Sequence, residues 1–567
     1  MHDMALRPSF VPLRVPLPAP PESSLPEVPD PASDRARAAS PIVSRLLATA
    51  VTDRSFESTT ASALVAELLD FAAACRLDYA TALVAESASA SPPSVGGECA
   101  LGTDVLEDRQ EDFECLAAAA AMDAEMTSWK STGTYVYEVP PPGANIVDGM
   151  WIFRGVDYFQ TFSPTPKMTT LRVLLHVAAQ RDYELHSLDF SIAFLHSSLH
   201  KEIWLRRPPG FTESFAAGTQ WSLWWPVYGL RQAPREWHDT QRTTLAALGF
   251  APATADPSLF LHIDTSLPPF YVLVYVDDLV FATADTEAAA LVKLELQKRH
   301  TCTDLGELRS YLGLQITLDR ARCTITLSQS HMVHQSVEPS GLYPELVGCL
   351  MYLMTCTRPD LAYPLSLLAR YVALGRHRKV HWDAAKRVLR YLCSTLGMGL
   401  MLGGRGPVFL TGHADASWVD ESATQRSSKG YTFSLGSGSV SWRSTRSSSV
   451  LSSSCEAEIH AGAMVAQELR WLTYLLTDLG EQPRSPPVLY IDNKAMIALC
   501  QEHKLELRTK YIALRYFLAR ELQQRGQLRL AYVTIRANAA YIFTKALPPG
   551  DHQRFSTVLG LLALLFA

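Results

Sequence analysis

At 567 residues, the chain is long enough for about three to four domains. Hydrophobic residues make up 47% of it and the net charge is −6, so ordinary cores are expected and a generally basic nucleic-acid-binding protein is excluded. Any nucleic-acid contact must then come from local basic patches. The 10 cysteines include no Cys-x-x-Cys pair, which argues against a zinc knuckle or a disulfide framework and favours a reducing compartment.

The two ends of the chain carry no predicted site. Residues 1–115 combine a stretch rich in Pro, Ser and Ala with short helical runs, and we interpret them as a low-complexity, disordered linker. No basic segment followed by an apolar run marks a secretory signal. Residues 548–567 form a C-terminal tail. Its apolar end, from Leu559, is about half as long as a membrane span, so we expect a frayed or truncated end and no membrane partner.

Between these ends, hydrophobic periodicity predicts alternating helices and strands. The first expected elements are a helix at 171–180, a strand at 184–189, a helix at 234–248 and two strands at 271–276 and 279–281. A connecting region over 336–407 contains a basic helix at 381–392. From residue 408 the pattern changes to three strands, a helix, a strand and a helix, which indicates an independent α/β unit over 408–547.

The most informative segment is Tyr275-Val276-Asp277-Asp278. Its β-branched and aromatic flanks predict two buried strands, so the two acids fall at the turn of a hairpin. A solvated turn is sufficient to explain an Asp-Asp pair taken alone, because Asp is a favoured turn residue. Two adjacent carboxylates against a hydrophobic wall repel each other, however, and a divalent metal would neutralise them. A third acid, Asp189, ends the strand predicted at 184–189 and fits the same metal site.

Several segments in one order resemble the reverse transcriptases of copia-type LTR retrotransposons, from residue 121 to 545. They are Thr161-Phe162-Ser163-Pro164, Asp189 with Ala193-Phe194-Leu195, Tyr228 to Trp237, Tyr275 to Asp278, Asp304-Leu305-Gly306, Tyr311-Leu312-Gly313 and Thr357-Arg358-Pro359-Asp360. The resemblance implies an α+β and α/β multidomain fold. A right-hand polymerase with fingers, palm and thumb would occupy 116–335, and a ribonuclease H-like mixed-sheet domain would occupy 408–547.

For the polymerase, the resemblance implies that Asp189, Asp277 and Asp278 are catalytic and hold two Mg²⁺ ions, with Mn²⁺ as the alternative. It assigns nucleotide binding to Phe194, Gln232 and Tyr275. Phe194 would lie against the sugar and disfavour a 2′-hydroxyl, although an ordinary core position explains this residue when it is taken alone. Two interpretations remain for a group of basic residues: they bind nucleic acid, or they form a merely solvated surface. These residues are Arg231, Arg235, Arg376, Lys379, Lys386 and Arg387.

The unit from residue 408 resembles a ribonuclease H domain. Asp415 and Asp492 each end a predicted strand, and the remaining acid must be Glu456 or Glu458. These two glutamates lie about 200° apart on a helix, so both cannot face one site. The run from Ser453 to Glu456 is typical of a capping box, which leaves Glu458 pointing inward, as the resemblance also implies. Asp415, Glu458 and Asp492 are therefore the expected catalytic acids, again with two Mg²⁺ ions.

Three departures from the family pattern indicate a decayed or internally spliced copy. Arg154 runs directly into Gly155, where the family has a further fingers segment that clamps the triphosphate. Gln335 runs directly into Ser336, where the family has more thumb. Tyr541 stands where a last ribonuclease acid is expected, and a phenol titrates only near pH 10. Losing ~3–4 kcal/mol of transition-state stabilisation would slow catalysis by a factor of about 10² to 10³.

The expected function is an RNA-directed DNA polymerase with ribonuclease H of a copia-type retrotransposon, weakened or lost in this copy. Its partners would be an RNA template, a DNA primer, an RNA–DNA hybrid and deoxynucleoside triphosphates. A catalytically dead nucleic-acid-binding remnant of the same scaffold is the alternative. The chain resembles the C-terminal part of a larger polyprotein. We expect it in the cytoplasm, within virus-like particles, with the nucleus as a second location.

Overall fold

The computed structural model describes residues 163–336, 343–372, 377–417, 426–447, 454–481, 485–501 and 518–564, with short gaps between 192 and 231, and a few strand residues between 133 and 147. The predicted linker over 1–115 and the junction at Arg154 and Gly155 lie outside these residues. Within the described part of the chain, no helix has the length and apolar character needed to span a membrane.

A six-stranded antiparallel sheet carries the Tyr275 to Asp278 segment. Its strand order is β10-β3-β9-β8-β7-β6. The strands are β3 (Glu184–Phe190), β6 (Phe250–Pro252), β7 (Leu259–His262), β8 (Phe270–Tyr275), β9 (Asp278–Thr283) and β10 (Cys302–Glu307). The strands predicted at 184–189, 271–276 and 279–281 are confirmed to within about two residues, and the two acids do fall at the β8–β9 turn.

Both faces of this sheet are buried, which explains its nearly continuous apolar sequence. The helices around it are α5 (Met168–Arg181), α6 (Ala233–Ala247) and α7 (Thr286–Arg299). Val272 and Val274 belong to the same hydrophobic cluster as the buried residues of α6 and α7. Leu273, between them, belongs to the cluster of α5. Because neighbouring side chains of a strand point to opposite faces, α5 lies on one side of the sheet and α6 with α7 on the other.

A second, five-stranded sheet corrects the predicted end of the chain. Its order is β11-β12-β13-β14-β20. The strands are β11 (Ser310–Tyr311), β12 (Leu314–Asp319), β13 (Thr324–Ser328), β14 (Met398–Gly403) and β20 (Leu561–Ala563). The frayed tail predicted from Leu559 was wrong, because β20 pairs with β14 and α15 (Pro549–Val558) packs beside it. The sheet also joins strands from both sides of the predicted boundary at 335–336.

The remaining N-terminal strands form a small sheet of order β1-β5-β4-β2. These strands are β1 (Tyr135–Glu138), β2 (Ile146–Val147), β4 (Ile203–Leu205) and β5 (Gln220–Leu223). Between β13 and β14 in the chain, a helical region packs around its own hydrophobic cluster. Its helices are α8 (Ser330–Ser336), α9 (Tyr343–Cys356), α10 (Ala362–Val372) and α11 (Lys379–Ser394), the last of which confirms the basic helix predicted at 381–392.

The motif Thr357-Arg358-Pro359-Asp360 has a structural role in this helical region. Arg358 and Asp360 form an ion pair of 2.7 Å whose side chains are 6% and 0% exposed. Burial alone would raise the pKa of Asp360, but the Arg358 guanidinium and the Tyr391 hydroxyl outweigh it and lower the pKa. Tyr391 lies on α11, so the pair ties that helix to the segment between α9 and α10.

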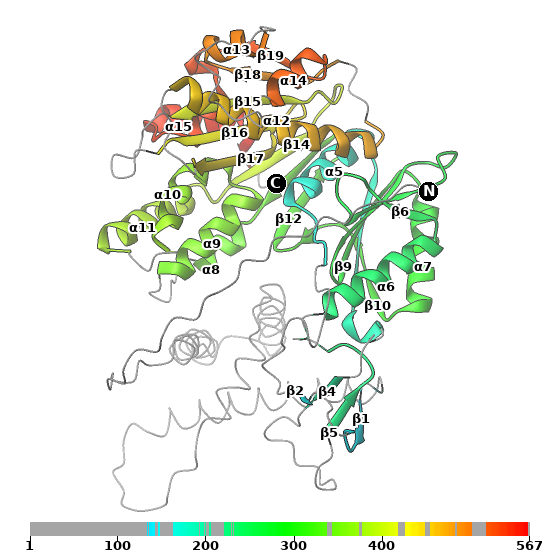
Figure 1. Cartoon of the computed structure of the whole chain (residues 1–567). Helices are drawn as coiled ribbons and strands as arrows, with labels where there is room; N and C mark the ends of the chain where they lie inside the picture. The colour runs from blue at the N-terminus through cyan, green and yellow to red at the C-terminus, as the bar shows by residue number, and fades with distance from the viewer. Residues whose placement is uncertain are drawn as a thin grey trace, which may run out of the picture.

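The C-terminal unit is a mixed sheet of order β17-β16-β15-β18-β19 with helices packed on it (Figure 1). The strands are β15 (Thr411–Ser417), β16 (Ser428–Ser434), β17 (Ser439–Arg446), β18 (Val488–Ile491) and β19 (Arg529–Tyr532). The helices are α12 (Ser454–Asp478), α13 (Lys494–Gln501) and α14 (Leu518–Gln524). The predicted succession of three strands, a helix, a strand and a helix is confirmed.

One buried arginine joins three parts of the molecule. Arg172 on α5 is 4% exposed and donates to the carbonyl oxygens of Thr355, Cys356 and Val440 at 2.7, 3.0 and 2.7 Å. Its guanidinium also lies 3.9 Å from the ring centroid of Trp442. Burial lowers the pKa of Arg172 to about 10, so it is still charged at neutral pH. The carbonyl dipoles and the indole face therefore hold a cation between α5, α9 and β17.

The far end of α12 is fixed to the six-stranded sheet. Trp471 donates from its indole nitrogen to the carbonyl of Ala255 at 2.8 Å, and Asp478 accepts from the amide of the same residue at 2.8 Å. Arg181 at the end of α5 pairs with Glu481 at 2.6 Å. Figure 1 shows α5 between the six-stranded sheet and the C-terminal unit. The six-stranded sheet and the C-terminal unit are therefore joined through α5 and α12, by hydrogen bonds and an ion pair.

The β8–β9 turn is strained and clamped. Val276 has φ of 56°, a left-handed conformation that a β-branched residue adopts at a cost of about 1–3 kcal/mol. Its carbonyl oxygen accepts two hydrogen bonds of 2.6 Å, from the Trp237 indole and the Gln241 amide. These donors are four residues apart on α6, so they share one helix face. The turn is held in its strained form by α6.

We predict that Gln241→Leu destabilises the protein by about 1–2 kcal/mol, because the Val276 carbonyl loses one of two buried donors. Thr243→Ala on the exposed face of α6 is the matched control and should change the free energy of unfolding by less than about 0.5 kcal/mol. Chemical denaturation of the full chain measures both. Equal stability of Gln241→Leu and the natural chain would show that the turn does not depend on α6.

Candidate active sites

Three strands bring the predicted polymerase acids to one end of the six-stranded sheet. Asp189 on β3 pairs directly with Asp278 on β9, and Tyr275 on β8 pairs with Asp278 from the other side. Asp277 lies in the turn between β8 and β9, and its carbonyl accepts a 2.9 Å hydrogen bond from the amide of Phe190. All three acids are partly exposed. The backbone register therefore places three partly exposed acids at one end of the sheet, but among the described residues their ligand oxygens do not all lie within 4.8 Å of one another.

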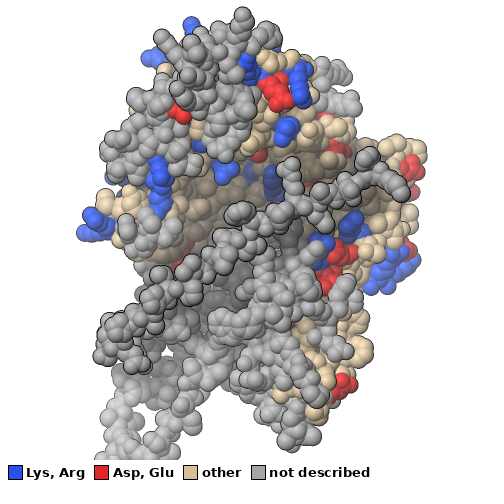
Figure 2. Space-filling model, viewed as in Figure 1, with Lys and Arg blue, Asp and Glu red and all other residues tan. Residues whose placement is uncertain are grey.

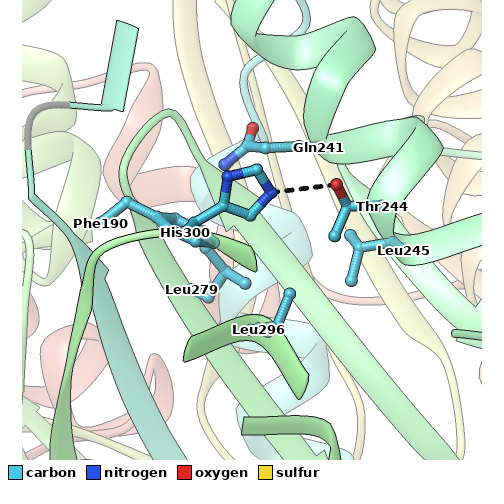
Figure 3. A pocket seen from close by; sticks show the side chains of 7 residues that line it. All are labelled: Phe190, Gln241, Thr244, Leu245, Leu279, Leu296 and His300. Carbon is cyan, nitrogen blue, oxygen red and sulfur yellow. Dashed lines mark hydrogen bonds between the residues drawn. The ribbon is translucent and has the colours of Figure 1, made fainter. Parts of the chain in front are cut away.

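The layer beneath this turn is apolar and uncharged. A small pocket there is lined by Phe190, Gln241, Thr244, Leu245, Leu279, Leu296 and His300 (Figure 3). The ring of His300 makes a 3.1 Å hydrogen bond with the Thr244 hydroxyl. Burial, with smaller contributions from the nearby His196 and Arg299, lowers the pKa of His300 to about 4. A neutral imidazole at pH 7 thus supports the turn without adding a competing positive charge.

The expected nucleotide-binding residues occupy more enclosed positions. Phe194 follows β3 in a short 3₁₀ helix and is 8% exposed within the cluster of α6 and α7. Gln232 precedes α6 and is 6% exposed, and its Oε1 has no hydrogen-bond partner among the described residues. Tyr275 is half-buried at the end of β8. A buried amide oxygen without a partner is costly, so Gln232 retains an unused polar contact at the start of α6.

Of the predicted basic residues, Arg231 and Arg376 lie outside the described part of the chain. Arg235 forms a 2.8 Å ion pair with Asp239 on α6. Lys379, Lys386 and Arg387 are exposed on α11, whose opposite face packs into the helical core. Basic side chains are visible at the left edge of Figure 2, where Figure 1 shows α11. Arg390 adds a further exposed cation to this helix.

A second acid cluster lies in the C-terminal unit. Asp415 comes from β15, Glu458 from the first turns of α12 and Asp492 from the end of β18. Each offers a carboxylate oxygen, and the three oxygens lie within 4.8 Å of one another. The parallel register of β15 and β18, with Ala414 opposite Ile491, places the following acids side by side. Glu456 instead lies 4.0 Å from His460. The geometry therefore favours Glu458 over Glu456.

The electrostatics of this cluster are unfavourable without a cation. Asp415 is 1% and Glu458 is 6% exposed. Burial raises the pKa of Asp415. Burial, followed by the charges of the two aspartates, raises the pKa of Glu458 well above its usual range. Burial, followed by the charge of Asp415, raises the pKa of Asp492 to about 6. Asp415 Oδ1 and Glu458 Oε2 are buried without a hydrogen-bond partner. Unpartnered oxygens of this kind fit a hard divalent ion such as Mg²⁺.

Two residues after β19 contact Asp415, and a third, Tyr541, contacts one of these two. The Thr544 hydroxyl donates to Asp415 Oδ2, and the Lys545 ammonium lies 3.9 Å from the same oxygen. Tyr541 is half-buried in the 3₁₀ helix η5 (Ala539–Phe543). Gly430 on β16 permits this approach, because a Cβ there would collide with Phe543. Tyr541 was singled out from the sequence as a replaced acid, but no role for Thr544 or Lys545 was predicted.

Gln241 is the other residue near a candidate site that the sequence analysis missed. It was not part of any motif, and only its spacing of four residues from Trp237 marks it as sharing that residue's helix face. Its contact with Val276 depends on how α6 packs against the sheet. No local pattern carries that information.

Comparison with known proteins agrees with these features. A family model described as "Reverse transcriptase (RNA-dependent DNA polymerase)" matches residues 137–348. The chain is 32% identical over 78% of its length to 34% of the "Retrovirus-related Pol polyprotein from transposon RE2" of Arabidopsis thaliana. It is 31% identical over 50% of its length to 100% of the "Putative transposon Ty5-1 protein YCL074W" of Saccharomyces cerevisiae. It spans about a third of the length of the first curated relatives.

Among solved structures, a foamy viral protease-reverse transcriptase in complex with dsDNA aligns with 81% of this chain and 87% of its own, at 14% identity and a TM-score of 0.41. By its sequence relatives and the matching family model, the chain belongs to the Pol polyproteins of copia-type retrotransposons and contains their reverse transcriptase domain.

Proposed function

We propose that this chain is the RNA-directed DNA polymerase and ribonuclease H region of a copia-type retrotransposon, with both activities reduced. The observation that carries the polymerase proposal is the register of Asp189 opposite Asp278, with Asp277 in the adjoining turn, inside the segment that matches the reverse transcriptase family. Its partners are an RNA template, a DNA primer and deoxynucleoside triphosphates. The ribonuclease partner is an RNA–DNA hybrid.

In this proposal Asp189, Asp277 and Asp278 hold divalent Mg²⁺. When bound, such ions lower the pKa of an attacking hydroxyl or water and neutralise phosphate oxygens. Trp237 and Gln241 fix the turn that carries Asp277, so its carboxylate does not have to be ordered during the reaction. Phe194, Gln232 and Tyr275 contact the bound nucleotide in this proposal.

The mixed sheet and its acid cluster support the ribonuclease part. Asp415, Glu458 and Asp492 come from two neighbouring parallel strands and the helix that packs on them. In the proposal, their two unpartnered oxygens accept a divalent ion, and the cluster directs a water toward an RNA phosphate. Exposed cations of α11 bind the nucleic-acid backbone, which is the sequence-independent part of binding.

The reduction in activity rests on three features of the sequence. The fingers segment expected after Arg154 is missing, more thumb is expected after Gln335, and Tyr541 replaces an acid. A polymerase that lacks its cationic clamp keeps its acids but loses stabilisation of the triphosphate. A nucleic-acid-binding remnant without catalysis is the alternative, and Tyr541 is the observation that favours it for the ribonuclease unit.

Primer extension on a poly-rA template with Mg²⁺ tests the polymerase part. We predict slow, distributive extension that Asp277→Asn abolishes and that Asp264→Asn, an exposed acid in the β7–β8 loop, leaves unchanged. Equal extension by Asp277→Asn and the natural chain would refute the polymerase assignment. Processive synthesis that depends on Asp277 would instead refute the proposed loss of activity.

Cleavage of an RNA–DNA hybrid tests the ribonuclease part. We predict weak or no cleavage by the natural chain and at least ~10-fold faster cleavage by Tyr541→Asp, because the variant restores a carboxylate beside the cluster. Tyr541→Asn is the uncharged control. Absence of cleavage in all three proteins would favour the binding remnant.

Salt dependence of hybrid binding tests the basic helix. We predict that replacing Lys386, Arg387 and Arg390 by Gln lowers the slope of log affinity against log salt by about 2–3, because each of these cations would neutralise about one phosphate. Gln replacement of Arg309 and Arg322, which are exposed elsewhere, is the matched control. An unchanged slope would show that α11 presents only a solvated face.

A further inference from the structure

We propose that the ammonium group of Lys545 is a built-in cation of the C-terminal acid cluster and replaces one of its two expected divalent ions. The cluster of Asp415, Glu458 and Asp492 would then bind a single divalent ion. This inference rests on the proposed metal-binding role of the cluster. It changes the expectation of two Mg²⁺ ions at this site.

The geometry puts the cation beside the most deeply buried acid. Lys545 Nζ lies 3.9 Å from Asp415 Oδ2, and the Lys545 side chain is 33% exposed whereas that of Asp415 is 1% exposed. The ammonium group therefore lies at the Asp415 side of a cluster whose three ligand oxygens are within 4.8 Å of one another.

Tyr541 holds the ammonium group in place. Lys545 Nζ lies 4.0 Å from the centroid of the Tyr541 ring, a distance typical of a cation–π contact. The ring itself packs near Phe555 of α15, with centroids 6.3 Å apart. The family resemblance implies a metal-ligating acid at position 541. The aromatic ring offers no carboxylate oxygen, and it binds the organic cation instead.

Charge balance favours the same conclusion. Three ionised carboxylates carry three negative charges. One divalent ion together with one ammonium group neutralises them, whereas two divalent ions beside Lys545 would leave two positive charges in excess. Four carboxylates would balance two divalent ions. Tyr541 replaces the expected fourth acid and holds the Lys545 ammonium beside the cluster. This replacement therefore lowers by one the number of ions that the cluster can hold.

The number of Mn²⁺ ions bound to the full chain tests this proposal. Electron paramagnetic resonance counts free Mn²⁺ during titration, and the difference between a protein and its Asp415→Asn derivative isolates this cluster from the other acids. We expect a difference of one ion for the natural chain. The double variant Tyr541→Asp with Lys545→Met should give two. Tyr541→Phe, which keeps the ring, and Lys545→Arg, which keeps the charge, should both give one.

Affinity provides a second readout. Lys545→Met alone should bind its single ion at least ~10-fold more tightly, because a neighbouring positive charge is removed. A difference of two ions in the natural chain would overturn the inference while leaving the metal site intact. An affinity unchanged by Lys545→Met would overturn it as well. A difference of zero in the natural chain would refute the proposed metal role of the cluster itself.

Discussion

Repulsion between carboxylates that are nearly removed from water is the constraint on which the C-terminal unit depends. Asp415 and Glu458 are almost completely buried, and each keeps an oxygen without a hydrogen-bond partner. Burial of a charge is expensive unless a counter-charge is supplied. Burial, followed by repulsion from Asp415, raises the pKa of Asp492 to about 6, so the metal-free cluster takes up protons more readily. The proposed cation would supply the counter-charge that these buried acids lack.

Carboxylates also lie close in sequence in the six-stranded sheet, where one of them is carried by a strained turn. Its acids are partly exposed, so solvent lowers their repulsion, but the turn that carries Asp277 has a valine in a left-handed conformation. Two hydrogen bonds from α6 to the Val276 carbonyl, above a neutral imidazole and apolar side chains, make that conformation the stable one. Arg172 and the end of α12 then fix this sheet against the C-terminal unit.

Much of this arrangement follows from local sequence patterns. The β8–β9 hairpin, the strand that carries Asp189 and the element order after residue 408 were predicted because periodicity reports which side chains are buried. The choice of Glu458 over Glu456 followed from helix geometry and agrees with the observed cluster. Contacts between distant segments were not predictable in this way. The clamp by Gln241, the pairing of β20 with β14 and the approach of Lys545 to Asp415 depend on packing between segments far apart in the chain.

We propose that two sets of acids, carried by two different sheets, are divalent-cation sites. Anomalous diffraction from crystals of the full chain grown with Mn²⁺ and an RNA–DNA hybrid tests it most directly. We expect manganese peaks beside Asp189, Asp277 and Asp278. We also expect one peak among Asp415, Glu458 and Asp492, with the Lys545 ammonium still on the Tyr541 ring. Crystals with manganese bound elsewhere and no peak at either acid set would contradict it.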